Sequence, residues 1–252
     1  MESKKCFKSI FSKNNIFYTI IFIIALLVII ANRIINGFHK VLWICDIASI
    51  CGILNVIFAA KHKIYTLYFN LLSTILLAVT NIYQHVWLNA FICIAINSPM
   101  LAVGIFRWKK NDKKNGNLNE LSKKSQIISW SIYALVSVIF IFILKAIGGN
   151  VYVFDAIYSA GCVFGVIFSS YAYIDQFKFF TFANLFGVAM YIILTIQNIN
   201  NLPLLFTNII YTIIEIIGYI NWRKLQKEKI TSLVQEKNED LKELVENEGN
   251  NL

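Results

Sequence analysis

The chain has 252 residues, of which 58% are hydrophobic and only 15% charged, and its formal net charge is +9. A soluble domain usually carries about 25% charged residues, so this composition indicates a membrane protein and excludes an ordinary soluble domain. The basic residues lie in short segments between apolar runs, as the positive-inside rule describes. They do not form a patch mixed with aromatic residues, so nucleic acid is not an expected partner.

Apolar runs of about 17–25 residues are long enough to cross a lipid bilayer. The sequence predicts eight such spans, with approximate bounds, in chain order: Ile16–Ile35, Val41–Ala60, Ile64–Tyr83, Val86–Phe106, Ile127–Ile147, Val151–Tyr173, Phe179–Ile196 and Leu202–Asn221. If the N-terminus is cytoplasmic, 20 of the 23 Lys and Arg residues fall on the cytoplasmic side. We therefore predict an all-α, polytopic membrane protein with both termini in the cytoplasm.

Three acidic side chains lie inside these spans: Asp46, Asp155 and Glu215. A buried carboxylate is costly in lipid, so each should lie near the membrane surface or line a wet cavity. Asp46 and Asp155 lie about five residues into their spans, close to the interface. Glu215 lies deeper, about eight residues from the cytoplasmic end of its span. It either pairs with a nearby basic residue or faces a path through the membrane.

No pattern of a catalytic or metal site is present. The sequence has no glycine-rich phosphate loop, no GxSxG and no HExxH motif. The five cysteines lack CxxC spacing and are interpreted as small packing residues: Cys6, Cys45, Cys51, Cys93 and Cys162. We expect neither an enzyme nor a bound cofactor or metal.

Two short patterns occur twice in the same order. Gly104–Trp108 and Gly218–Trp222 both read Gly-x-x-x-Trp and precede basic residues, and Val56–Ala60 (VIFAA) matches Val166–Ser170 (VIFSS). The second to fourth spans therefore resemble the sixth to eighth, with the fifth as a linker and the first as an extra helix. Two such three-helix units share one orientation in the membrane, which makes them parallel repeats with a path at their interface.

The predicted organisation is thus two three-helix repeats joined by a linker helix (3+1+3) plus one N-terminal helix. In residue numbers it comprises a cytoplasmic lead-in and extra helix (1–40), the first repeat (41–108), a cytoplasmic loop and linker helix (109–150), the second repeat (151–222) and a polar cytoplasmic tail (223–252).

The last two spans each carry polar and aromatic residues at helical spacing on one face. These residues are Phe177, Phe180, Asn184, Gly187 and Tyr191 on the first, and Asn208, Tyr211 and Glu215 on the second. Aromatic rings, an amide and a carboxylate on converging faces predict a pocket for a small, planar, polar molecule. Helix packing stabilised by hydrogen bonds is the alternative.

The 3+1+3 order, the twin Gly-x-x-x-Trp ends and the face Phe177-x-x-Phe180-x-x-x-Asn184 resemble the PnuC family of nicotinamide riboside transporters, which has a SWEET-like fold. The resemblance covers about Val41 to Trp222. Asn184 matches the asparagine of the family motif, whereas phenylalanines stand where the family has two tryptophans. Phenylalanine keeps the stacking face and loses the indole N–H donor. Where the family tends to have glutamine in the fourth span, this chain offers Cys93, with Asn89 and Asn97 on the same face.

The resemblance implies a homotrimer in the bacterial inner membrane that carries a vitamin precursor by facilitated diffusion, with trapping by a separate kinase. The ligand ring would stack on Phe177 or Phe180. The polar partners would come from Asn184, Tyr191, Asn208, Tyr211, Asn97 and Asn89. Thiamine, riboflavin or deoxynucleosides are alternative substrates. An ion-coupled transporter that uses Glu215 or Asp155 is an alternative mechanism, and a membrane receptor that binds without transport is a third reading.

Overall fold

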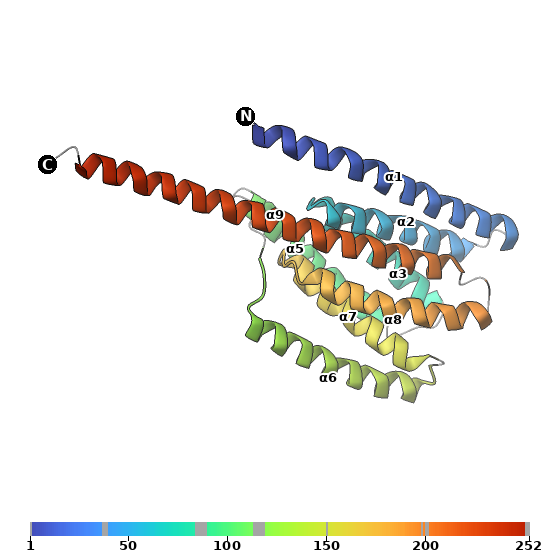
Figure 1. Cartoon of the computed structure of the whole chain (residues 1–252). Helices are drawn as coiled ribbons and strands as arrows, with labels where there is room; N and C mark the ends of the chain where they lie inside the picture. The colour runs from blue at the N-terminus through green and yellow to red at the C-terminus, as the bar shows by residue number, and fades with distance from the viewer. Residues whose placement is uncertain are drawn as a thin grey trace.

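The computed structural model describes residues 2–36, 40–83, 90–112, 119–149, 151–197, 199 and 202–249. Within these ranges the chain consists of helices joined by short turns, with one isolated β-bridge between Asn119 and Tyr173. Figure 1 shows the helices as a bundle, with the N-terminal helix on one side and α6 on the other. The last helix continues well beyond the bundle.

The helices are α1 (Glu2–Asn36), α2 (Lys40–Ala60), α3 (Tyr65–Tyr83), η1 (Ile92–Asn97), α5 (Ser98–Asp112), α6 (Lys123–Ile147), α7 (Tyr152–Ser170), α8 (Gln176–Gln197) and α9 (Leu202–Gly249). Most of the helices contain one predicted span, and α1 and α9 extend well beyond theirs. Six of the described helices are long and apolar enough to cross a membrane. This confirms an all-helical chain with several candidate spans, whereas the full count of eight stays a prediction.

The two predicted spans outside that set are the third and the fourth. The apolar part of α3, Tyr65–Thr80, is shorter than a full span. The predicted span Val86–Phe106 begins outside the described residues, and its described part is divided between η1 and α5. Hydropathy identified both segments as apolar, but their helical lengths do not follow from hydropathy.

Pro99 explains why η1 is a π-helix. Proline has no N–H, and its ring crowds the carbonyl four residues earlier, so the regular α-helical bond to Ala95 cannot form. Instead the Ser98 N–H donates to the Cys93 carbonyl, five residues back, and the Ser98 hydroxyl donates to the same oxygen at 2.8 Å. The widened turn leaves Cys93 and Asn97 buried, and such turns are frequent at functional sites.

Two tryptophans make matching contacts near the ends of the bundle. The Trp108 indole N–H donates to the Ser169 carbonyl at 3.0 Å, at the end of α7. The Trp222 indole N–H donates to the Ala59 carbonyl at 2.8 Å, at the end of α2. Ala59 and Ser169 occupy the same place in the repeated VIFAA and VIFSS segments. Each predicted three-helix unit thus provides a tryptophan whose indole N–H binds a carbonyl at the C-terminal end of the first helix of the other unit.

The chain leaves α2 and α7 in the same way. His62 and Ala172, each three residues beyond a capped carbonyl, have positive φ values of 51° and 57°. After each of them the backbone N–H returns to a matching carbonyl: Lys63 to Phe58 and Tyr173 to Phe168, both at 3.0 Å. The two helix ends therefore share side-chain and backbone geometry.

The extra helix α1 is fixed to the bundle by an ion pair. The Arg33 guanidinium binds both oxygens of Asp46 on α2, with one N–O distance of 2.7 Å. Both side chains are buried, so each charge is compensated where it leaves water. Asp46 was expected simply to lie near the interface, and the structure adds this partner for it.

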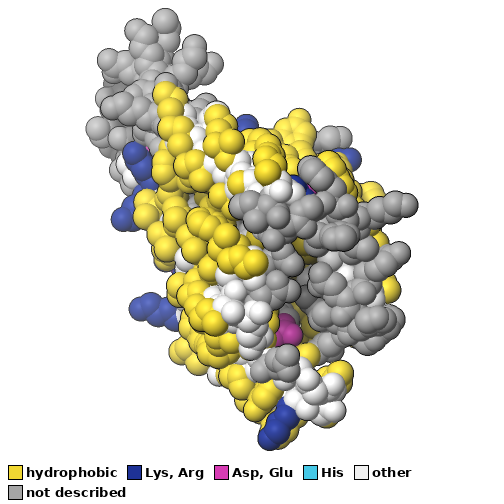
Figure 2. Space-filling model, turned by 90° about the vertical axis from the view of Figure 1, so that its right-hand side faces the viewer, with side chains coloured by type: hydrophobic (Ala, Val, Ile, Leu, Met, Phe, Trp, Pro, Cys, Tyr) yellow, Lys and Arg dark blue, Asp and Glu magenta, His cyan; other side chains and the backbone are white. Residues whose placement is uncertain are grey.

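The outer surface suits lipid. On α6 the exposed side chains include Ile127, Ile132, Leu135 and Phe142, and only 17% of this helix is buried. In Figure 2 most of the described side chains on this face are hydrophobic, and Lys and Arg side chains lie toward its edges. Since the helices satisfy their own backbone hydrogen bonds, apolar side chains can face the bilayer without cost.

We expect Trp108→Phe and Trp222→Phe each to destabilise the protein by about 1–2 kcal/mol, because each removes a buried hydrogen bond between an indole N–H and a backbone carbonyl. Thermal unfolding in detergent measures the effect. Trp130→Phe is the matched control, since Trp130 stacks on Phe179, with ring centroids 4.3 Å apart, and its indole makes no hydrogen bond to the described residues. Equal losses in all three variants would show that the two indole–carbonyl bonds are not the cause.

Candidate substrate-binding cavity

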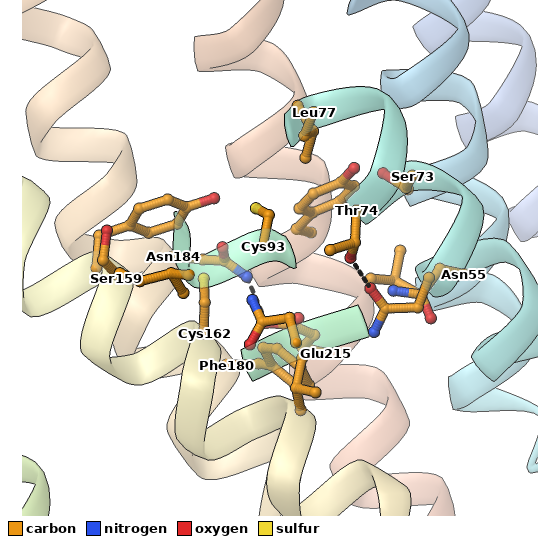
Figure 3. Close-up of a pocket in the computed structure, with 18 residues that line it drawn as sticks. Asn55, Ser73, Thr74, Leu77, Cys93, Ser159, Cys162, Phe180, Asn184 and Glu215 are labelled. Carbon is orange, nitrogen blue, oxygen red and sulfur yellow. Dashed lines mark hydrogen bonds between the residues drawn. The ribbon is translucent and has the colours of Figure 1, made fainter. Parts of the chain in front are cut away.

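A cavity of about 110 Å³ lies between α2, α3, η1, α7, α8 and α9. Its lining mixes amides, hydroxyls, aromatic rings and one carboxylate, as Figure 3 shows in part. The residues are Gly52, Asn55, Val56, Asn70, Ser73, Thr74, Leu77, Ile92, Cys93, Asn97, Tyr158, Ser159, Cys162, Val166, Phe180, Asn184, Tyr211 and Glu215. Both predicted three-helix units therefore contribute side chains to the lining.

Glu215 and Asn184 meet in this cavity from neighbouring helices. The Asn184 amide donates to one Glu215 carboxylate oxygen at 2.7 Å, and the two side chains point toward each other in Figure 3. Both are almost fully buried, with 4% and 3% of their surface exposed. No ion pair joins Glu215 to a basic residue within the described part of the chain. Glu215 thus faces the cavity without a basic partner among the described residues, and its role in a transport path stays a prediction.

Two glycines bring aromatic rings close to the helices behind them. A Cβ atom at Gly165 would lie 2.5 Å from the Phe180 ring, and one at Gly52 would lie 1.7 Å from the Tyr211 hydroxyl. Any larger residue at either place would have to displace the ring. The glycines therefore position Phe180 and Tyr211 at the cavity wall.

The polar wall opposite is formed by α2, α3 and η1. Thr74 donates a long hydrogen bond of 3.4 Å to Asn70, and Thr66 donates to the Asn55 side-chain oxygen at 2.6 Å. The side-chain oxygen of Asn97 is buried and has no hydrogen-bond partner among the described residues. A buried acceptor of this kind is costly until a donor reaches it.

The structure brings five of the predicted site residues together at the cavity: Asn97, Phe180, Asn184, Tyr211 and Glu215. Cys93, which was aligned with the family glutamine, also lines it. The other predicted residues lie elsewhere or outside the described part of the chain, and their role in binding stays a prediction.

Phe177 packs against Trp222, with ring centroids 5.1 Å apart, and against Gly218. It lines a smaller hollow that shares Phe180 and Glu215 with the main cavity.

Asn208 and Tyr191 are outside the main lining. The Asn208 amide donates to the Leu204 carbonyl at 2.9 Å, and its side-chain oxygen lies beside Gly187. Asn89 lies outside the described residues.

Sequence reasoning missed the contribution of α3 and α7. Asn70, Ser73, Thr74 and Leu77 all line the cavity, and they recur at i, i+3, i+4 and i+7 on α3. That spacing marks one helical face and was a usable signal. Tyr158, Ser159 and Cys162 form a similar face on α7.

A polar chamber enclosed by helices with an apolar outer surface defines a membrane transport protein for a small polar solute. Residues 42–224 match the model of the nicotinamide mononucleotide transporter family, and the chain belongs to that family. Its members are transporters, so this chain is a transporter and not an enzyme, and the resemblance drawn from the sequence is confirmed.

Two known proteins are similar to this chain. The nicotinamide riboside transporter PnuC of Neisseria mucosa is 25% identical over 197 residues, which are 73% of each chain. A crystal structure of the vitamin B3 transporter PnuC superposes with a TM-score of 0.67 at 20% identity, covering 84% of this chain and 92% of that one. The second likeness shows that the fold is shared.

Proposed function

We propose that the protein takes up nicotinamide riboside by facilitated diffusion. The observation that supports this most directly is the cavity itself, in which an aromatic ring, amides and a carboxylate surround one small space. The Phe180 ring stacks on the flat pyridine ring, while Asn184 and Asn97 bind the carboxamide or the ribose hydroxyls. Each such bond replaces one made to water, so the site selects solutes that satisfy all of its buried polar groups.

The cavity must widen to admit this substrate. Its volume of about 110 Å³ is below the roughly 300–1,000 Å³ of typical ligand pockets. We propose that the two three-helix units rock about the axis between them and expose the site to each side in turn. The reciprocal indole–carbonyl bonds of Trp108 and Trp222, which join the units, support this arrangement of eight spans in a 3+1+3 order.

The remaining parts of the proposal follow from the family resemblance. The protein functions as a homotrimer in the bacterial inner membrane, with both termini in the cytoplasm, as the distribution of basic residues favours. A separate kinase phosphorylates the imported riboside. The phosphate group of the product carries about two negative charges at neutral pH, and the product is retained because an anionic group is disfavoured beside Glu215.

Counterflow in liposomes tests the function. Vesicles preloaded with unlabelled nicotinamide riboside should accumulate the labelled compound transiently, without ATP and without a proton or sodium gradient. Vesicles preloaded with thiamine, riboflavin or a deoxynucleoside give the comparison for substrate choice. Exchange with only one of those compounds would show that this compound, and not nicotinamide riboside, is the substrate. Uptake that depends on an imposed gradient would show ion-coupled transport in place of facilitated diffusion. Binding without exchange would indicate a receptor.

A further inference from the structure

Glu215 is the only acidic residue among the side chains that line the cavity, and the described lining contains no Lys, Arg or His. Among the described residues, its hydrogen-bond donor is the neutral amide of Asn184. The basic residues near the cytoplasmic end of the bundle are used elsewhere: Lys178 pairs with Asp175 at 2.6 Å and Arg223 pairs with Glu120 at 2.7 Å. The centre of the bundle therefore holds an acid with no compensating protein charge among the described residues.

An acid in this position is costly unless something offsets its charge. The rest of the cavity suits a cationic ring. Phe180, Tyr158 and Tyr211 all line it, and aromatic faces attract cations. The free acceptor on Asn97 adds a place for a donor on the ligand. Carboxylate, aromatic rings and amide oxygen together favour a planar monocation that carries hydrogen-bond donors.

We propose that Glu215 is the counter-charge for the substrate, and that the cavity distinguishes a cationic ring from a neutral ring of the same shape. This inference rests on the proposed function and narrows it. Nicotinamide riboside and thiamine each carry a permanently positive ring nitrogen, whereas riboflavin and deoxynucleosides are neutral. The carboxylate therefore selects the first two, and it supplies the charge that lets a cation cross the middle of the bilayer.

A pair of probes isolates the charge. Nicotinamide riboside is cationic, and dihydronicotinamide riboside, with one hydride added to the ring, is neutral and has the same ribose and carboxamide. We expect the unmodified protein to bind the cation at least about tenfold more tightly, because close opposite charges in a partly desolvated site favour binding. Glu215→Gln should bring the ratio of the two dissociation constants close to one, and Glu215→Asp should keep a preference for the cation. Calorimetry on purified protein in detergent measures all of these constants.

The outcomes separate this inference from the proposed function. Equal affinity of the unmodified protein for both ribosides would overturn the role of Glu215 while leaving nicotinamide riboside as the substrate. Binding of thiamine alone, lost in Glu215→Gln and kept in Glu215→Asp, would support the counter-charge and replace the substrate. If neither cation binds, or if Glu215→Gln keeps the full preference, the inference is wrong. Even if a variant fails to fold, equal affinity of the unmodified protein for the two ribosides overturns the inference.

Discussion

Asn184→Leu is expected to weaken the binding of nicotinamide riboside about 100-fold, because a hydrogen bond to a charged group contributes about 1.5–3 kcal/mol. The leucine removes the amide that donates to Glu215 at 2.7 Å, and it places an apolar side chain beside a buried carboxylate. The Glu215 carboxylate then loses the hydrogen bond that orients it, and the cavity loses the Asn184 amide as a polar group for the ligand. Calorimetry with purified protein measures the dissociation constant.

Asn221→Leu is the matched control. Asn221 lies on α9, like Glu215, but its amide donates to the Tyr18 hydroxyl at 3.3 Å and it is not part of the cavity lining. We expect this variant to keep its affinity to within about threefold, since it changes no group in the site. Wild-type affinity in Asn184→Leu would mean that the ligand binds somewhere other than this cavity.

The meeting of Asn184, Tyr211 and Glu215 could be predicted because polar side chains in a membrane helix turn away from lipid. In α8 and α9 these residues follow the 3.6-residue period, so each helix has one face that must point inward. Two inward faces on neighbouring helices then share a space. This argument needs only the sequence and the physical cost of a polar group in lipid.

Depth along a helix could not be predicted in the same way. Phe177 and Phe180 lie on one face of α8, but three residues correspond to about 4.5 Å along the axis. That shift is enough for Phe177 to pack on Trp222 while Phe180 reaches the main cavity. Spacing in the sequence identifies a face, whereas the neighbouring helix determines which residue of that face meets the cavity.

The contribution of α3 was missed for a related reason. Asn70, Ser73 and Thr74 were within an apolar run, and hydropathy averages over the whole run. A short polar face on an otherwise apolar helix does not lower that average enough to be noticed. The π-helix at Ile92–Asn97 is also invisible to hydropathy, since it depends on one proline and one local hydrogen bond.

The second large effect is expected at the aromatic wall. Phe180→Ala should weaken nicotinamide riboside binding about 100-fold, since removing an aromatic ring that stacks on a base costs about 1–3 kcal/mol. The empty space left by the Phe180 side chain would also let water approach Glu215. The cavity would then prefer nicotinamide riboside less strongly over other solutes. Phe180→Trp is a useful companion, because the resemblance drawn from the sequence predicts a tryptophan of the family motif at this position. The dissociation constants of both variants can be measured by calorimetry.

Phe177→Leu separates stacking from packing. Phe177 is 1% exposed and contacts both Trp222 and Gly218, so the smaller side chain should lower the free energy of unfolding by about 1 kcal/mol. If Phe180 is the stacking ring, the folded Phe177→Leu protein should bind the riboside with an affinity within about threefold of the original.

The opposite result, with tight binding in Phe180→Ala and a large loss in Phe177→Leu, would assign stacking to Phe177. The ligand would then lie in the smaller hollow that both rings share, closer to the reciprocal tryptophan contacts. Either pattern locates the ring of the substrate along α8, because the two phenylalanines differ in depth and not in chemistry.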